Sequence, residues 1–175
     1  MPATGKLIGE LEGHDDEITC VAASPTSRLL ASGANDETVR LWQMPEGRLT
    51  RVLDGHFAGV NGLAFSADGC LLAVASNDYL VRIWNPETGE LLNTLEGHEE
   101  PARGVAFSAD GRLLISTSYD GTVRLWQPQT ARCLAVLDHF EGGVNAVALT
   151  PDDALLAIAA NDPTIQLWDT ADLPL

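Results

Sequence analysis

The stretch that decides the fold is GHEEPARGVAFSADGRLLISTSYDGTVRLW, residues 97–126. Its pattern recurs along the 175-residue chain every 42 residues, without insertion or deletion. The interval is marked by tryptophans that each follow an aspartate by six residues: Trp42, Trp84, Trp126 and Trp168 after Asp36, Asp78, Asp120 and Asp162. A period of this length is typical of repeat architectures in which each unit is one supersecondary element.

Each unit contains four short runs of aliphatic and β-branched residues separated by turn sequences. In the second unit, VNGLAFS begins at Val60 and LLAVAS at Leu71, with the turn sequence Ser66–Gly69 between their apolar parts. This pattern predicts a four-stranded antiparallel meander. Runs such as LLAVAS are apolar on both faces, so each sheet must lie between two others. We therefore expect an all-β fold, one domain over 1–175. Its units are 12–53, 54–95, 96–137 and 138–175.

Three further landmarks recur: a Gly-His pair, the aspartate, and an aliphatic residue before the tryptophan. They are Gly13-His14, Asp36 and Leu41-Trp42; Gly55-His56, Asp78 and Ile83-Trp84; and Gly97-His98, Asp120 and Leu125-Trp126. In this pattern the chain resembles the WD-repeat family of β-propellers over essentially its whole length. The resemblance implies four four-stranded antiparallel blades per chain. It also implies a non-catalytic scaffold that binds peptide or protein partners through one face of the propeller.

The resemblance further implies a structural hydrogen-bonded set of His, Ser or Thr, Asp and Trp in each blade, which gives the buried indole N–H an acceptor. Complete sets are expected at His14, Ser32, Asp36 and Trp42, and at His98, Ser116, Asp120 and Trp126. The second unit keeps His56, Asp78 and Trp84 but has Val74 in place of the hydroxyl. The fourth keeps Asp162 and Trp168, with Ile158 in place of the hydroxyl and His139-Phe140 in place of Gly-His. We therefore expect complete networks in alternate blades.

Partner-binding residues are sought where the units differ, because positions that vary on a fixed scaffold are free to specify a partner. The resemblance places such positions on the rim of the binding face. The candidates are Asn35, Asn61, Asn77, Arg103, Tyr119, Asn145 and Asn161. Arg103 and Tyr119 fall in one unit, and aromatic and arginine side chains are enriched at binding hot spots. The alternative is that Tyr119 only covers its hairpin and that Arg103 pairs with Glu99 or Glu100.

A Ser, His and Asp in one blade could also be read as a hydrolase triad. A nucleophile is needed once, however, whereas this set recurs with the period of the fold and lacks a Gly-x-Ser-x-Gly elbow. The histidines recur one per unit, so they are expected to be spread around the axis and not to converge on one metal ion. We therefore expect no enzyme activity, no metal and no cofactor, with a hydrolase as a remote alternative.

Composition limits the classes of partner and compartment. Ten Lys and Arg against 25 Asp and Glu give a net charge of −15, which repels nucleic acid and anionic membranes. The sequence has no apolar run long enough for a membrane span and no signal peptide, and its three cysteines form no Cys-x-x-Cys pair. We therefore expect a cytoplasmic protein with reduced thiols and no membrane partner.

The first residues of the chain repeat the last strand of a unit. Residues 4–11, TGKLIGEL, align with 88–95, TGELLNTL. Four blades would leave two apolar faces and an unpaired edge bare, unless they closed as a compact four-bladed ring. We therefore expect half of an eight-bladed ring, closed as a homodimer in which residues 4–11 of each chain complete the other's fourth blade. An alternative function is an engineered or structural self-assembling unit without an evolved partner.

The charge balance yields a direct prediction. The protein should not be retained by immobilised duplex DNA or by RNA at moderate salt, because the sequence shows neither a basic stripe nor a platform of stacking aromatics. Retention is measured as the salt concentration is raised. Binding of a duplex that weakens with salt would contradict the exclusion of nucleic acid.

Overall fold

The computed structural model describes residues 5–173 as four antiparallel sheets in a row. We call these sheets blades 1 to 4. Blade 1 contains β1 (Ile18–Ala23), β2 (Leu29–Ala34), β3 (Val39–Gln43) and β4 (Arg48–Leu53). Blade 2 contains β5 (Val60–Phe65), β6 (Leu72–Ser76), β7 (Val81–Trp84) and β8 (Leu91–Leu95). Blade 3 contains β9 (Ala102–Phe107), β10 (Leu114–Ser118), β11 (Val123–Gln127) and β12 (Arg132–Leu137). Blade 4 contains β13 (Val144–Leu149), β14 (Leu155–Ala160) and β15 (Ile165–Asp169), followed by the short 3-10 helix η1 (Thr170–Asp172).

Every blade is a meander in which consecutive strands pair antiparallel, with the same register in each copy. In blade 3, for example, Ser116 pairs with Arg124 and Val105, as Ser32 pairs with Arg40 and Val21 in blade 1. The prediction of an all-β chain of four antiparallel sheets is confirmed. No helix in the described part of the chain is long and apolar enough to cross a membrane.

The core lies between blades, as expected for sheets that are apolar on both faces. Between blades 1 and 2, Leu41 and Val39 lie in one cluster with Leu72 and Val74. Equivalent clusters join blade 2 to blade 3 and blade 3 to blade 4. All five residues of β6, LAVAS, are buried. Each interior blade is therefore held by its two neighbours.

The innermost strands approach one another closely because glycine occupies them. A Cβ built on Gly62 of β5 would lie 2.3 Å from the carbonyl oxygen of Arg103 on β9. The backbone of β9 cannot move away without opening the interface between blades 2 and 3. Glycine at this position therefore fixes the spacing of neighbouring blades near the axis.

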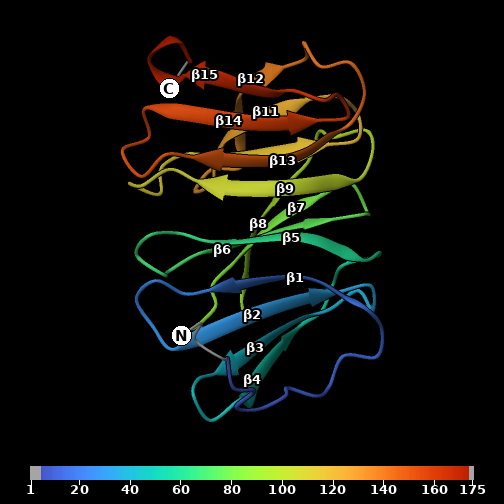
Figure 1. The fold of residues 1–175 in the computed structure, drawn as a ribbon, viewed down its shortest axis with the longest axis vertical. Helices are drawn as coiled ribbons and strands as arrows, with labels where there is room; N and C mark the ends of the chain where they lie inside the picture. The colour runs from blue at the N-terminus through green and yellow to red at the C-terminus, as the bar shows by residue number, and fades with distance from the viewer. Residues whose placement is uncertain (1–4, 174–175) are drawn as a thin grey trace.

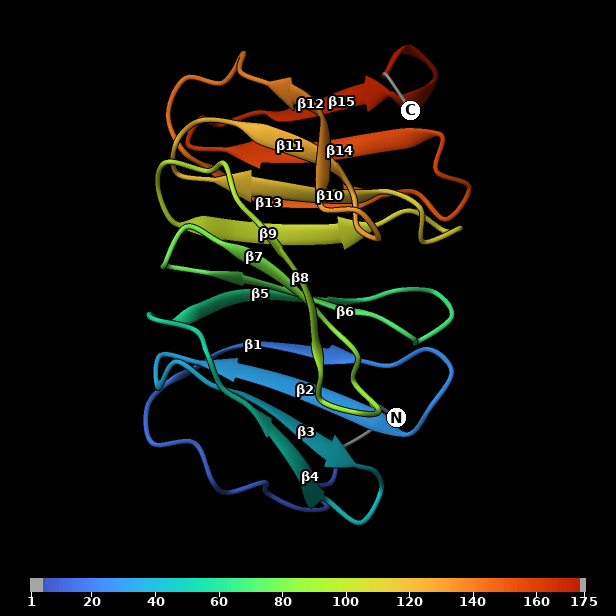
Figure 2. The same ribbon diagram turned by 180° about the vertical axis from the view of Figure 1, so that it is seen from behind.

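The four blades do not close on themselves. In both views β5 and β9 lie between β1 and β13, and blades 1 and 4 stand at opposite ends of the row (Figures 1 and 2). The compact four-bladed ring is therefore not the arrangement of the single chain. Blade 4 has three strands among the described residues, one fewer than the other blades.

The predicted closing strand, residues 4–11, is not a strand in the single chain. Thr4 lies outside the described residues, and residues 5–14 pair with no strand. Leu7 and Ile8 are largely exposed. Leu11 lies against Gly47, in the turn between β3 and β4. The segment thus runs beside blade 1, at the opposite end of the row from blade 4.

Candidate functional site

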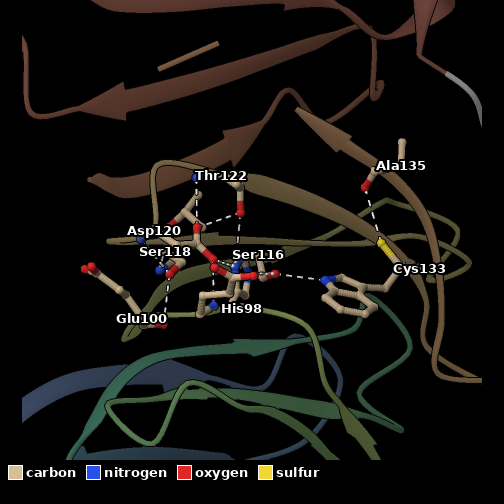
Figure 3. Close-up of polar contacts among 12 residues, drawn as sticks. His98, Glu100, Ser116, Ser118, Asp120, Thr122, Cys133 and Ala135 are labelled. Carbon is tan, nitrogen blue, oxygen red and sulfur yellow. Dashed lines mark hydrogen bonds and ion pairs between the residues drawn. The ribbon is translucent and has the colours of Figure 1, made fainter. Parts of the chain in front are cut away.

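Blade 3 holds a complete hydrogen-bonded network that links its central strands to the loops at one end. Trp126 on β11 donates from Nε1 to Ser116 Oγ on β10 over 2.8 Å. Ser116 Oγ lies 2.8 Å from His98 Nε2, and His98 Nδ1 lies 2.9 Å from Asp120 Oδ2 (Figure 3). Asp120 also accepts from Thr122 and from the backbone N–H of Glu99. Four elements of one blade are thereby tied together.

The donors and acceptors of this network fix its proton order. An ionised carboxylate only accepts, so His98 carries its proton on Nδ1 and donates it to Asp120. His98 Nε2 then accepts from the Ser116 hydroxyl, whose oxygen accepts from Trp126. Burial lowers the pKa of His98, partly offset by the nearby Asp120. The neutral imidazole is therefore the stable form.

Blade 1 repeats the network with nearly the same distances. His14 lies 2.8 Å from Asp36 Oδ2 and 2.7 Å from Ser32 Oγ, which accepts from Trp42 Nε1 over 2.9 Å. Burial acts to raise the pKa of Asp36, but hydrogen bonds from the backbone of Asp15 and from Thr38 and His14 overcome it and hold the pKa at about 2. The structure thus brings together all four residues of both complete sets.

Blade 2 replaces the network by a buried ion pair. Arg82 Nη1 donates to Asp78 Oδ2 over 2.7 Å and lies 3.2 Å from His56 Nδ1. Arginine can only donate, so His56 accepts on Nδ1 and carries its proton on Nε2, the opposite tautomer to His98. His56 Nε2 and Trp84 Nε1 are buried with no hydrogen-bond partner. Val74 lies at the position where a serine would accept from both.

Sequence reasoning did not find the role of Arg82. Arginines stand at the same position in blades 1 and 3, Arg40 and Arg124, so the residue type carries no signal. The available signal lay two residues before Arg82, where Leu80 replaces the threonine of the other units. Losing that hydroxyl leaves the aspartate short of a donor, and the guanidinium supplies one.

Blade 4 has an apolar substitute for the network. Phe140 and Ile158 are buried where the histidine and serine would stand. The exposed His139 ring is nearly parallel to the ring of Trp168, with an interplanar angle of 7° and centroids 6.3 Å apart. Trp168 Nε1 finds its acceptor in Gln166, 3.3 Å away. Asp162 accepts from Thr164 at the hairpin instead.

The Ser–His–Asp sets are built into the packed blades in this arrangement. Ser116 is completely buried, and its oxygen is occupied by Trp126 and His98. A substrate carbonyl could reach the hydroxyl only if the blade interface opened. Among the side chains that the structure describes, no group of three potential metal ligands is found. Neither observation supports the remote hydrolase reading.

The predicted rim residues lie at one end of the blades (right-hand side of Figure 1). Asn61, Arg103 and Asn145 are the second residues of β5, β9 and β13, and the others lie in the loops joining β2 to β3, β6 to β7, β10 to β11 and β14 to β15. Asn61 donates to Asn77 over 2.6 Å and to the carbonyl oxygen of Ala102 on the next blade over 2.8 Å. Asn145 similarly donates to Asn161 over 2.8 Å. Asn35 lies beside Gly59 in the neighbouring blade. Most of these asparagines therefore have scaffold contacts.

Arg103 and Tyr119 are brought together. The guanidinium of Arg103 lies 4.6 Å from the ring centroid of Tyr119 and donates to Asn61 Oδ1 over 3.1 Å. No ion pair to Glu99 or Glu100 is formed among the described residues. The arginine is thus held by an aromatic face and an amide, which leaves its charge without a carboxylate partner at the rim.

Two further aromatic side chains on this rim were missed by the sequence reasoning. Phe57, in the loop leading into β5, is 79% exposed, and Tyr79, between β6 and β7, is 45% exposed. The equivalent positions hold mostly charged or small residues: Asp15, Glu99 and Glu141, and Glu37, Gly121 and Pro163. That contrast was the signal. We call Phe57, Tyr79, Arg103 and Tyr119 the rim set.

Comparison with known proteins agrees with the sheet architecture. The model of the WD40 family, described as "WD domain, G-beta repeat", matches residues 5–43, 47–85, 89–127 and 131–169. The chain belongs to the WD40 repeat family. The predicted resemblance is thereby confirmed over four repeats.

Similar curated proteins match over about one repeat each. Eukaryotic translation initiation factor 3 subunit I of Neurospora crassa is 44% identical over 45 residues, which is 26% of this chain and 13% of that protein. WD40 repeat-containing protein HOS15 of Arabidopsis thaliana is 54% identical over 37 residues, 21% of this chain and 6% of that protein. Small ribosomal subunit protein RACK1y of Oryza sativa is 46% identical over 44 residues, 25% of this chain and 13% of that protein. The matched part is thus a small share of these relatives.

The contrast between blades 2 and 3 predicts unequal effects of two equivalent substitutions. Trp126→Phe should lower the free energy of unfolding by about 1–3 kcal/mol more than Trp84→Phe. The first removes the donor to Ser116, whereas the second removes an indole N–H that has no acceptor. Urea unfolding of both variants measures the difference. Equal losses would show that the networks have no energetic weight.

The environment of His56 predicts acid sensitivity. Burial, with the Arg82 charge adding to it, lowers the pKa of His56 from 6.5 to about 4, although Asp78 and Asp54 act to raise it. Between these two pH values the unfolded chain binds a proton that the folded chain does not. The free energy of unfolding should therefore fall as the pH drops from 6.5 to 4, by up to roughly 3 kcal/mol from this residue.

His56→Gln should flatten that pH dependence, and urea unfolding at several pH values measures it. The matched control is His139→Gln, since His139 is exposed. The two variants are compared by the slope of stability against pH and not by absolute stability. An unchanged slope in His56→Gln would contradict the assignment of a buried neutral imidazole.

Proposed function

We propose that this protein is a non-catalytic scaffold that binds a peptide or protein partner through the rim set. The observation that carries the proposal is the Arg103–Tyr119 pair, in which the guanidinium lies 4.6 Å from the ring centroid, together with the exposed ring of Phe57 at the same end of the blades. Arginine and tyrosine are enriched among residues that dominate binding energy. Family membership supports the proposal, and none of the three relatives has the name of an enzyme.

Preorganisation of the rim supports the same conclusion. Asn61 holds Arg103 in place and is itself bonded to Asn77 and Ala102. Ordering a long side chain on binding costs about 0.5–1.5 kcal/mol, and here much of that ordering is already present. On a chain with a net charge of −15, an arginine without a carboxylate partner favours an acidic group on the ligand. We therefore propose a partner segment that combines an acidic and an apolar side chain.

We also propose a second function as an assembly unit. The outer faces of blades 1 and 4 carry exposed apolar side chains at positions that are buried in the interior blades. Each face is shaped to receive a further blade of the same repeat, and an eight-bladed ring is the closed form we propose. In the structure all three cysteines are unpaired thiols, which supports a reducing, cytoplasmic compartment.

The scaffold proposal predicts where a ligand binds. Random peptides displayed on phage are selected against the immobilised protein, and the affinity of the best binder is measured by calorimetry. Phe57→Ser and Tyr119→Ser should each weaken it about thirtyfold or more, because hot-spot truncations cost at least about 2 kcal/mol.

The matched control for the peptide titration is Arg112→Ser. Arg112 is exposed in the turn between β9 and β10, at the opposite end of the blades. A peptide whose affinity depends on Arg112 and not on the rim set would contradict the proposed binding face. Failure to select any binder would count against the scaffold function itself.

A further inference from the structure

The outer face of blade 4 exposes side chains that are buried in every other blade. Ile165 and Leu167 on β15 are 70% and 66% exposed. One repeat earlier, Val123 and Leu125 on β11 are completely buried against blade 4. The sequence at this face is unchanged in character, so the difference arises only because no neighbour covers it.

The outer face of blade 1 is likewise uncovered, on the opposite side of the row. Ile18 and Val21 on β1 are 48% and 64% exposed. One repeat later, Val60 is completely buried and Leu63 is half-buried, both in the cluster shared with blade 1. Blade 1 therefore lacks a neighbour on the side by which blades 2, 3 and 4 contact their predecessors.

We propose that a second copy of this chain covers both faces, so that two copies close one eight-bladed ring head to tail. This inference rests on the proposed assembly function and names its partner. The blade 4 face and the blade 1 face are the two halves of the interface that already joins consecutive blades three times within the chain. A second copy continues that interface in the same register.

The number of copies follows from the open row. A ring built only from copies of these four blades contains a multiple of four blades, and four do not close in the single chain (Figure 1). Eight is the next number. Two copies related by a two-fold axis then bury both open faces of each, whereas a head-to-tail contact that failed to close would give filaments.

Residues 6–11 supply the fourth strand of the partner's blade 4. The WD40 match begins at residue 5, and the repeats place 6–11 at the positions of β4 and β12. Leu53 and Leu95, which correspond to Leu11, are buried in their blades. β15 forms the edge of its sheet. The segment and the edge thus match as donor strand and acceptor.

The register of this exchange can be read from blade 3. There Val123 pairs with Leu137 and Gln127 with Arg132. Residues one repeat after β11 lie on β15, and residues three repeats before β12 lie in the segment 6–11. By this equivalence Ile165 pairs with Leu11 of the partner subunit, and Asp169 pairs with Lys6 of the partner subunit. The closing strand therefore pairs an apolar residue with an apolar one and an acid with a base.

One polar contact completes the match at the rim. Within the chain Asn61 donates to Asn77 and also to the carbonyl oxygen of Ala102 on the next blade. Asn145, the equivalent residue of blade 4, makes the first of these bonds, to Asn161. In the ring its second acceptor is the carbonyl oxygen of Ile18 of the partner subunit.

Like charge opposes this association, because each copy carries a net charge of −15. The interface itself is apolar, and interactions between solvent-exposed charges are screened beyond about 8 Å at physiological ionic strength. Added salt should therefore strengthen the dimer. An association held mainly by surface ion pairs would weaken under the same conditions.

The first test is the mass of the intact chain at micromolar concentration, measured by light scattering. We expect twice the 18.6 kDa of one subunit. Leu167→Glu should give a monomer that keeps its β circular dichroism, because Leu167 is exposed in the single chain. The matched control is Leu92→Glu, on the outer strand β8 of blade 2, which should stay dimeric. A folded monomer from the unmodified chain overturns the inference, as does a dimer that survives Leu167→Glu.

The second test is a charge swap across the exchanged strand. Lys6→Glu should weaken the dimer several-fold, since the pair occurs twice in each ring. Asp169→Lys should do the same, but Asp169 also accepts from the N–H of Ala171 at η1. The decisive comparison is therefore between Asp169→Lys alone and the double variant that also carries Lys6→Glu. The double variant should form the stronger dimer. Additive weakening by the two substitutions overturns the exchanged register.

A tandem fusion of two copies separates this inference from the assembly function. One outcome is a monomeric single chain whose open faces bind an apolar dye. If the fusion then no longer binds that dye, the open faces do accept further blades, and only the second-copy inference fails. If the fusion binds the dye as strongly per blade as the single chain, the assembly function fails as well.

Discussion

Every blade of this protein is apolar on both faces, and the rest of the structure depends on that constraint. A sheet with one polar face can rest on a single layer, but β6 and β10 bury side chains on both sides. Only neighbouring sheets can cover them. Stacking in turn fixes the strand spacing near the axis, where Gly62 allows backbone contact. It also buries polar groups of the central strands away from water.

Those polar groups explain the complete networks of blades 1 and 3. The indole N–H of Trp126 is buried between blades and needs an acceptor, which Ser116 provides. In blade 2 two hydroxyls are replaced. Val74, in place of the serine, leaves two donor atoms without partners. Leu80, in place of the threonine, leaves Asp78 to the guanidinium of Arg82, and the histidine takes the other tautomer. The blade still folds because its apolar faces are intact. Packing therefore dominates, and the network adjusts to it.

The sequence predicted the parts of the fold that depend on periodicity. The 42-residue interval of the tryptophans and the runs that are apolar on both faces suffice for stacked antiparallel sheets. The Ser32 and Ser116 sets follow from the family pattern together with the buried indole. The side-chain orientation of a residue that recurs in several units could not be predicted. Arg82 and Arg124 occupy equivalent positions, and their orientations differ only because of the hydroxyls around them. Phe57 was overlooked because it is the only aromatic residue among its periodic equivalents, and its exposure depends on the blade packing.

The rim set and the open faces are separate surfaces that the proposed ring connects. The rim is built from loops and strand starts at one end of the blades, whereas the open faces are the sheets themselves. Closing the ring does not cover Arg103 or Tyr119, but it places two copies of that pair on one face, related by the two-fold axis. A partner with two binding segments gains effective concentration from that geometry when its linker spans the two sites. A rim of individually modest contacts can then bind a divalent partner tightly. On this view assembly and recognition are one property of the apolar blade: the interface that closes the ring also sets the distance between its binding sites.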